Sequence, residues 1–252
     1  MIKAWIPRQH GVWAMMIAPV LAGGIIAGYQ WFHAVLLGAW VIAYLGFMAV
    51  RGWLRPRGGL NYRVPTLTYG ALAALCVGVL VVWRPAFWWW AIPLAVLLGT
   101  SLLLIVTGKE RTVLNDGLLI GASALMTVIA ATASRLSSMG WSAFIDTAAV
   151  PGAWLVAAVY AGYFWGTIFY VKTMIRERGK LRWYVISVVY HAFLVIPGFL
   201  VNLWIGLVSV LILIRAILVP RLWPRTKPKW IGFGEIAITI IVTIIVSCTL
   251  RL

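Results

Sequence analysis

The sequence has few charged residues, and acidic residues are the rarest of them. Only 10% of the 252 residues are charged and 63% are hydrophobic, whereas a soluble domain carries about 25% charge. A soluble chain of this size could not bury so much apolar surface, so we predict that lipid is its solvent. The two cysteines, Cys76 and Cys248, lie inside apolar runs without metal-ligand spacing, and we interpret them as small buried hydrophobes.

The motifs of several soluble enzyme classes are also absent. The sequence contains no Walker loop, no GxGxxG after a strand, no HExxH and no GxSxG. The 21 basic residues outnumber the five acidic ones, which gives a net charge of +16. Because the basic residues lie in short loops between apolar runs, they indicate membrane topology and contacts with anionic lipid headgroups. We therefore expect membrane lipid, and no nucleic acid, as a partner.

Apolar runs long enough to cross a bilayer recur along the chain, since a spanning helix needs roughly 20 residues. The runs lie near 12–29, 31–50, 66–83, 86–107, 113–134, 149–171, 183–199, 200–219 and 231–250. The stretch 183–219 is about 55 Å long as a helix, nearly two bilayer cores, and Pro197-Gly198 is predicted to break it at a tight outer turn. The sequence thus predicts an all-α polytopic membrane bundle of about nine transmembrane helices in a single domain, 1–252.

The basic residues also predict the orientation of the bundle. With a cytoplasmic N-terminus, only Arg84, Arg135 and Arg251 face outward, which leaves 18 of the 21 basic residues inside. The positive-inside rule strongly favours this arrangement. We predict a multi-pass protein of the bacterial inner membrane.

Acidic residues gather at the predicted cytoplasmic side and indicate a pocket that opens there. Four of the five acids lie on that side: Glu110, Asp116, Glu177 and Glu235. Asp116 and Glu235 lie a few residues inside apolar runs, where a charge costs up to about 2.5–3.5 kcal/mol. Each of these two acids either complements the positive end of its own helix or takes part in binding.

Helix N-termini and basic side chains also lie at the predicted cytoplasmic side, and together they favour the binding of an anion. We predict the following substrate-binding residues: Gln9, Lys109, Arg111, Asn115, Tyr170, Lys172, Arg176, His191 and Arg215. Lys172 and Arg176 are four residues apart and would share one face of a continuing helix. We predict these catalytic residues: His10, Glu110, Asp116 and Glu235. Mg²⁺ is the candidate cofactor, held by Asp116 and Glu177. The alternative is that the basic side chains only reach toward lipid headgroups.

The three histidines give a weaker pattern. His33 is predicted to lie at an outer interface. His10 and His191 lie within or beside membrane helices, where a histidine pair could ligate haem or bind a quinone. The alternative is an interhelical hydrogen bond worth about 1 kcal/mol.

Several local strings resemble the YwiC-like family of bacterial membrane proteins. The strings are Pro7-Arg8-Gln9-His10-Gly11 with Trp13-Ala14-Met15, Glu110-Arg111 with Asn115-Asp116, FWGTIFYVKTMIRE from Phe164 to Glu177, Tyr190-His191, Arg215, and Lys229 with Gly232 and Glu235. They extend from the first helix to the last. The resemblance implies a multi-pass membrane protein and no particular activity.

The predicted architecture is distantly similar to that of UbiA-type prenyltransferases. That resemblance implies an isoprenyl diphosphate bound through Mg²⁺ at two Asp-rich motifs, in loops 2–3 and 6–7. The chain departs from the pattern, because its 2–3 loop, 51–65, contains no acid and its 6–7 loop offers only Glu177.

Three functions follow as hypotheses. The first is a UbiA-like intramembrane site, as in a prenyl- or lipid-type transferase, for an isoprenoid or lipid-linked anion at the cytoplasmic face. The second is a transporter of a small solute, and the third is an accessory or assembly factor of a respiratory membrane complex.

Overall fold

The computed structural model describes Trp5 and residues 10–54, 60–135 and 140–250, and these residues form helices and connecting loops without a strand. The helices are α2 (His10–Ile26), α3 (Trp31–Trp53), α4 (Arg63–Trp83), α5 (Phe87–Val106), α6 (Val113–Thr132), α7 (Trp141–Ala148), α8 (Pro151–Val171), α9 (Leu181–Val201), α10 (Leu203–Leu222) and α11 (Pro228–Thr249). A π-helical turn, Lys172–Arg176, continues α8.

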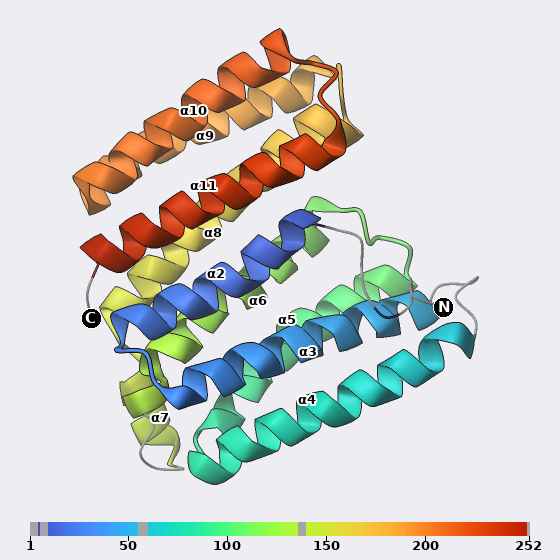
Figure 1. Cartoon of the computed structure of the whole chain (residues 1–252), viewed down its shortest axis with the longest axis vertical. Helices are drawn as coiled ribbons and strands as arrows, with labels where there is room; N and C mark the ends of the chain where they lie inside the picture. Colours follow the sequence, from blue (N-terminus) through green and yellow to red (C-terminus); the bar gives the residue numbers. More distant parts are fainter. Residues whose placement is uncertain (1–4, 6–9, 55–59, 136–139, 251–252) are drawn as a thin grey trace.

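Eight of these helices are long and apolar enough to cross a membrane, namely α3 to α6 and α8 to α11. The helix α2 adds a shorter apolar segment, Val12–Ile26. The long helices lie side by side, and successive ones alternate in direction (Figure 1). The predicted all-α polytopic membrane bundle is therefore confirmed.

The helix α6 lies at the centre of the bundle. In its apolar segment 67% of the residues are buried, against 6% in α4. Small side chains allow neighbouring helices to approach α6 closely, as is usual between membrane helices. Gly23 of α2 packs so tightly against the backbone of α6 that a Cβ atom there would clash with the carbonyl oxygen of Thr127. The contact of α2 with α6 therefore depends on glycine.

The break between α9 and α10 lies at Asn202, so the predicted break at Pro197-Gly198 is wrong. Asn202 has an extended backbone, and its side-chain oxygen accepts a hydrogen bond from the Trp204 amide at 2.9 Å, as an N-cap does. Gly198 instead serves packing, because a Cβ there would lie 3.2 Å from the Cα atom of Gly206 in α10. The Pro-Gly pair thus permits close contact between the two helices.

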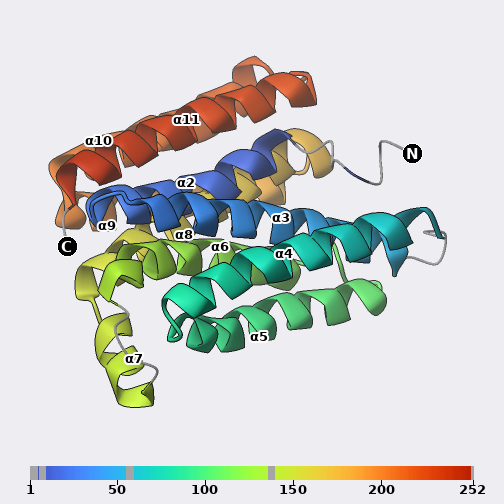
Figure 2. The same cartoon turned by 60° about the horizontal axis from the view of Figure 1, so that its bottom comes forward.

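The short helix α7 was not predicted, because its eight residues are too few to form a spanning run. It lies apart from the long helices, at the end of the bundle where α6 ends (Figure 2). Aromatic packing holds it there. The ring centroids of Trp141 and Trp89 are 4.8 Å apart, and those of Phe144 and Trp90 are 5.1 Å apart, both edge-to-face.

The side chain of His33, at the start of α3, is fully buried against other helices. Its Nδ1 accepts a hydrogen bond from the Gln30 amide at 2.9 Å. Its Nε2 is therefore the protonated nitrogen and donates to the carbonyl of Ala130, 3.0 Å away. His33 thus links the start of α3 to the end of α6.

Candidate functional site

A cavity of about 530 Å³ lies among α2, α3, α6, α8 and α11, and we call it the charged cavity. Its polar wall comes from one end of the bundle, where α3 and α8 end and α6 and α11 begin. The charged residues of this wall are Arg51, Glu110, Asp116, Lys172, Arg176, Lys229 and Glu235. The alternation of the helices therefore gathers Glu110, Asp116 and Glu235 at one end, as the sequence predicts.

Lys172 forms an ion pair across the cavity wall with Asp116. Its Nζ atom lies 2.8 Å from Oδ2 of Asp116, in the first turn of α6. The ammonium group also lies 5.0 Å from the centre of the Trp183 ring. Lys172 begins the π-helical turn, in which the Glu177 amide donates to the Lys172 carbonyl at 2.7 Å. Such turns are rare and often occur at functional sites.

Lys172 and Arg176, which were predicted to share one helical face, both line the charged cavity. They do so within a π-helical turn, whereas the prediction assumed a continuing α-helix.

Glu235 is the most deeply buried acid of the cavity, with 3% of its surface exposed. Its Oε1 lies 2.6 Å from Nη1 of Arg215, and its Oε2 accepts a hydrogen bond from Thr167 at 2.9 Å. The guanidinium of Arg215 stacks on the Tyr170 ring at 4.0 Å. Arg215 and Tyr170 were predicted to bind substrate, but the cavity wall does not include them. Arg215 instead pairs with Glu235, and Tyr170 packs against Arg215.

Glu110 is held at the opposite side of the cavity by Arg51, whose Nη2 lies 3.2 Å from its carboxylate. Asn115 orders the same loop. Its Oδ1 accepts a hydrogen bond from Ser101 at 2.6 Å, and its Nδ2 donates to the Glu110 carbonyl at 2.9 Å. Asn115 lines the cavity and positions Glu110. Sequence reasoning treated Arg51 only as a topology signal and overlooked Ser101, a lone hydroxyl in the apolar run of α5.

The acids of the chain leave two cations of the cavity without a counter-charge. Three of the five acids form the ion pairs just described, Glu177 pairs with Lys180 at 2.7 Å, and Asp146 is exposed in α7 at the other end. Arg176 and Lys229 are exposed, line the cavity, and have no carboxylate within 4.0 Å in the described part of the chain. This side of the cavity is therefore positive.

The predicted Mg²⁺ ligands do not form a metal site in this arrangement. The carboxylates of Asp116 and Glu177 face different lysines, and Glu177 is not part of the cavity wall. Within residues 10–54, 60–135 and 140–250, no group of three or more His, Cys, Asp and Glu side chains could hold a metal ion. A site for Mg²⁺ needs carboxylates that are free to coordinate it, so this donor set does not fit the ion.

Two other predicted site residues, Lys109 and Arg111, lie outside the charged cavity. Lys109 and Arg111 are exposed beside it, and 87% of the Arg111 side chain is accessible. Gln9 lies outside the described residues, and only the backbone of His10 is described. All four residues stay predictions. For Lys109 and Arg111 the alternative is a contact with lipid headgroups.

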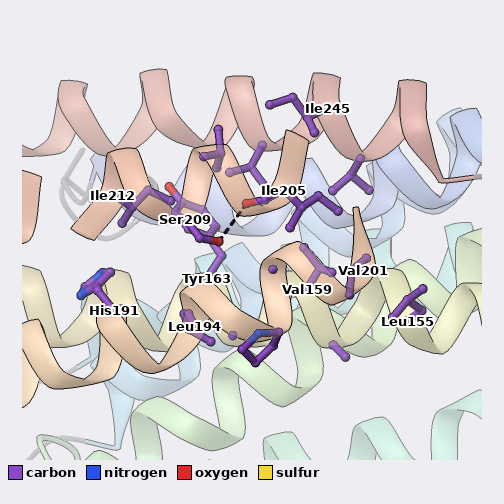
Figure 3. Close-up of a pocket in the computed structure, with 17 residues that line it drawn as sticks. Leu155, Val159, Tyr163, His191, Leu194, Val201, Ile205, Ser209, Ile212 and Ile245 are labelled. Carbon is purple, nitrogen blue, oxygen red and sulfur yellow. Dashed lines mark hydrogen bonds between the residues drawn. The ribbon is translucent and has the colours of Figure 1, made fainter. Parts of the chain in front are cut away.

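His191 lines a second cavity, of about 290 Å³, between α8, α9, α10 and α11. We call it the apolar cavity, because its wall consists mostly of Leu, Val and Ile side chains (Figure 3). The Nδ1 atom of His191 lies 2.6 Å from the carbonyl oxygen of Ser187, one turn earlier in α9, and donates its proton to it. His191 is 2% exposed and is separate from the charged cavity.

The sequence is similar to several known proteins. A family model described as "YwiC-like protein" matches residues 6–131. The uncharacterized protein YwiC of Bacillus subtilis is 28% identical over 194 residues, covering 77% of this chain and 76% of that protein. An uncharacterized protein of Haemophilus influenzae is 25% identical over 245 residues, covering 94% and 95%. No solved structure matches the chain.

Proposed function

The chain belongs to the YwiC-like family of bacterial membrane proteins, and we propose that its charged cavity binds an amphiphile with an anionic headgroup, of the isoprenoid or lipid-linked phosphate type. The observation that carries the proposal is the pair of cations, Arg176 and Lys229, which have no carboxylate within 4.0 Å among the described residues.

The chemistry of the two cations suits a phosphate or diphosphate group. A guanidinium such as that of Arg176 binds two oxygens of a phosphate at once, while an ammonium such as that of Lys229 acts as a mobile point charge. Pro228 and Lys229 begin α11, and the positive end of a helix dipole adds to the attraction for an anion. An anion would therefore neutralise the excess charge of the cavity.

The rest of the wall suits an apolar chain. Val12 and Met15 of α2, Phe47 of α3 and Ile168 of α8 contribute hydrocarbon surface to the same cavity. Methionine adapts its shape to irregular apolar ligands. The volume, about 530 Å³, lies within the range of about 300–1,000 Å³ typical of sites for small organic ligands. A ligand with an anionic head and an apolar tail matches both parts of the wall.

The proposal does not include Mg²⁺-dependent ionisation of a diphosphate. Each acid of the cavity already faces a cation of the protein, which fixes the shape and charge of the wall. The resemblance to UbiA-type enzymes thus supports the class of ligand in this proposal and carries no reaction step.

The test is direct binding to the purified full-length protein in detergent. The probe is an isoprenyl diphosphate, and its isoprenyl alcohol serves as the uncharged comparison. We expect the diphosphate to bind and the alcohol to bind at least tenfold more weakly, which corresponds to about 1.4 kcal/mol. Replacing both cations, as Arg176→Gln with Lys229→Gln, is expected to weaken diphosphate binding by about tenfold.

A matched control removes two exposed cations from the same end of the bundle but outside the cavity, as Arg182→Gln with Arg225→Gln. This variant should bind the diphosphate as the wild type does. Equal loss in both double variants would mean that the diphosphate is attracted by general surface charge. Equal affinity for the diphosphate and the alcohol would also overturn the proposal.

A further inference from the structure

Polar residues follow one another at every fourth position along α11. They are Glu235, Thr239, Thr243 and Ser247, and the residues between them are apolar. A spacing of four keeps side chains on one slowly turning face of a helix. The twelve steps from Glu235 to Ser247 cover about 18 Å along the axis, more than half of the roughly 30 Å hydrocarbon core.

Hydroxyl groups of α8 face this row, and both sets together form what we call the hydroxyl stripe. Thr167 donates to the carboxylate of Glu235 at 2.9 Å. One turn further into the bundle, the Tyr163 hydroxyl lies 2.9 Å from Oγ1 of Thr239. One turn beyond that, Tyr160 donates to Oγ1 of Thr243 at 2.8 Å. The stripe begins at the charged cavity, whose wall includes Glu235, Thr167 and Thr239.

Interhelical hydrogen bonds also hold membrane helices together, by about 0.6 kcal/mol each on average. Two features of the stripe go beyond that role. Its first member is an ionisable group, which is expensive within a membrane bundle. Its last member, Ser247, has a buried Oγ with no hydrogen-bond partner among the described residues. A hydroxyl without a partner does not join two helices.

We infer that the hydroxyl stripe is a proton path leading from the charged cavity toward the opposite end of the bundle. A proton from the cavity binds the carboxylate of Glu235 and replaces its ion pair with Arg215. Thr239 and Thr243 donate to the backbone carbonyls of Glu235 and Thr239, both at 2.7 Å. Each hydroxyl gives up this bond when it accepts a proton on its lone pair and releases its own to the next oxygen. Because successive turns place side chains about 5–6 Å apart, one water molecule per turn completes each step, and no oxidant or reductant is needed.

The groups that face Glu235 are compatible with this exchange. Arg215 of α10 supplies the only charge in direct contact among the described residues, and α8 contributes the hydroxyls of Thr167 and Tyr163. The described side chains of α2, 12–26, contain no titratable group. Across the cavity lie the pair of Asp116 with Lys172 and the two unpaired cations. When Glu235 is protonated, the Tyr170 ring still covers the Arg215 guanidinium.

The inference goes beyond the proposed amphiphile site, because it concerns proton movement in the absence of that ligand. It is tested by reconstituting the full-length protein into liposomes that contain a pH-sensitive dye. A potassium gradient with valinomycin then drives protons inward. We expect faster acidification than in protein-free liposomes, and a slower rate in D₂O. A wild-type rate equal to that of protein-free liposomes overturns the inference.

Variants separate a proton path from a structural role. Glu235→Gln and Thr243→Val are each expected to reduce the rate to that of protein-free liposomes. Thr132→Val is the matched control, because it removes a buried hydroxyl of α6 that bonds only a carbonyl of its own helix, that of Val128 at 2.8 Å. Thr132→Val should conduct as the wild type does.

The thermal stability of each variant shows whether it is folded. Should Glu235→Gln fail to fold, Ser247→Ala replaces it, since this hydroxyl has no partner to lose. Wild-type conduction in folded Thr243→Val and Ser247→Ala would show that the stripe carries no protons.

Discussion

The charged cavity and the apolar cavity share two helices, α8 and α11, yet their walls are chemically opposite. On α8 the charged cavity uses Thr167 to Arg176, and the apolar cavity uses Leu155 to Tyr163. The first cavity lies at the end of the bundle, where ion pairs reach toward water, and the second lies deeper along the helices. The comparison teaches that position along the helix, rather than the identity of the helix, decides which chemistry a wall can have.

The border between the two cavities is made by hydrogen bonds of hydroxyl groups. Thr167 and Tyr163, one turn apart on α8, bond to Glu235 and Thr239 on α11. At this depth a hydroxyl group can be buried at a small cost in free energy when it forms a hydrogen bond. Burying an unpaired charge there would cost much more. The border therefore marks where the polar end of the bundle gives way to its apolar interior.

The largest expected effect concerns the side of the membrane on which each region lies. In a background without Cys76 and Cys248, Lys180→Cys lies beside the charged cavity and Asp146→Cys lies at the other end, and both positions are exposed. We expect a membrane-impermeant maleimide to label Asp146→Cys in intact spheroplasts and Lys180→Cys only after lysis. The reverse pattern would invert the orientation and place the charged cavity on the outer side.

The next effect is the loss of a buried ion pair from the charged cavity. Glu235→Leu leaves Arg215, whose side chain is 14% exposed, without its counter-charge. We expect the free energy of unfolding to fall by about 3–5 kcal/mol. The double variant with Arg215→Leu should recover much of this loss, because no charge then remains unpaired. Chemical unfolding in detergent, followed by circular dichroism, measures both values, and additive losses would contradict the pairing.

The smallest effect concerns glycines on the wall of the apolar cavity. Gly198→Ala should lower the free energy of unfolding by about 1–3 kcal/mol, because its Cβ would lie 2.7 Å from Oγ of Ser209 and 3.2 Å from the backbone of Gly206. Gly162→Ala is the matched control, since its Cβ would meet only the side chain of Leu194 at 3.4 Å. Equal stability of the two variants would show that α9 and α10 do not depend on this close contact.

Much of the fold was predictable because length and hydropathy decide which segments cross a bilayer. The alternation of basic loops also predicted that Glu110, Asp116 and Glu235 gather at one end. The break at Asn202 was missed because proline can be accommodated within a membrane helix, while an N-cap depends on local backbone geometry. The burial of His33 was missed because nothing in the sequence near it indicates its partner, Ala130, 97 residues later.

The sequence by itself determined the class of solvent, the set of spanning helices and the layer to which the charged residues belong. These follow from the free energy of placing each side chain in lipid or water, which depends on the residue type at each position and not on how the helices pack. Only the tertiary structure decided which charges neutralise one another, and hence that Arg176 and Lys229 are left over. Ion pairing requires atoms within a few ångströms, and that distance is set by how distant helices pack.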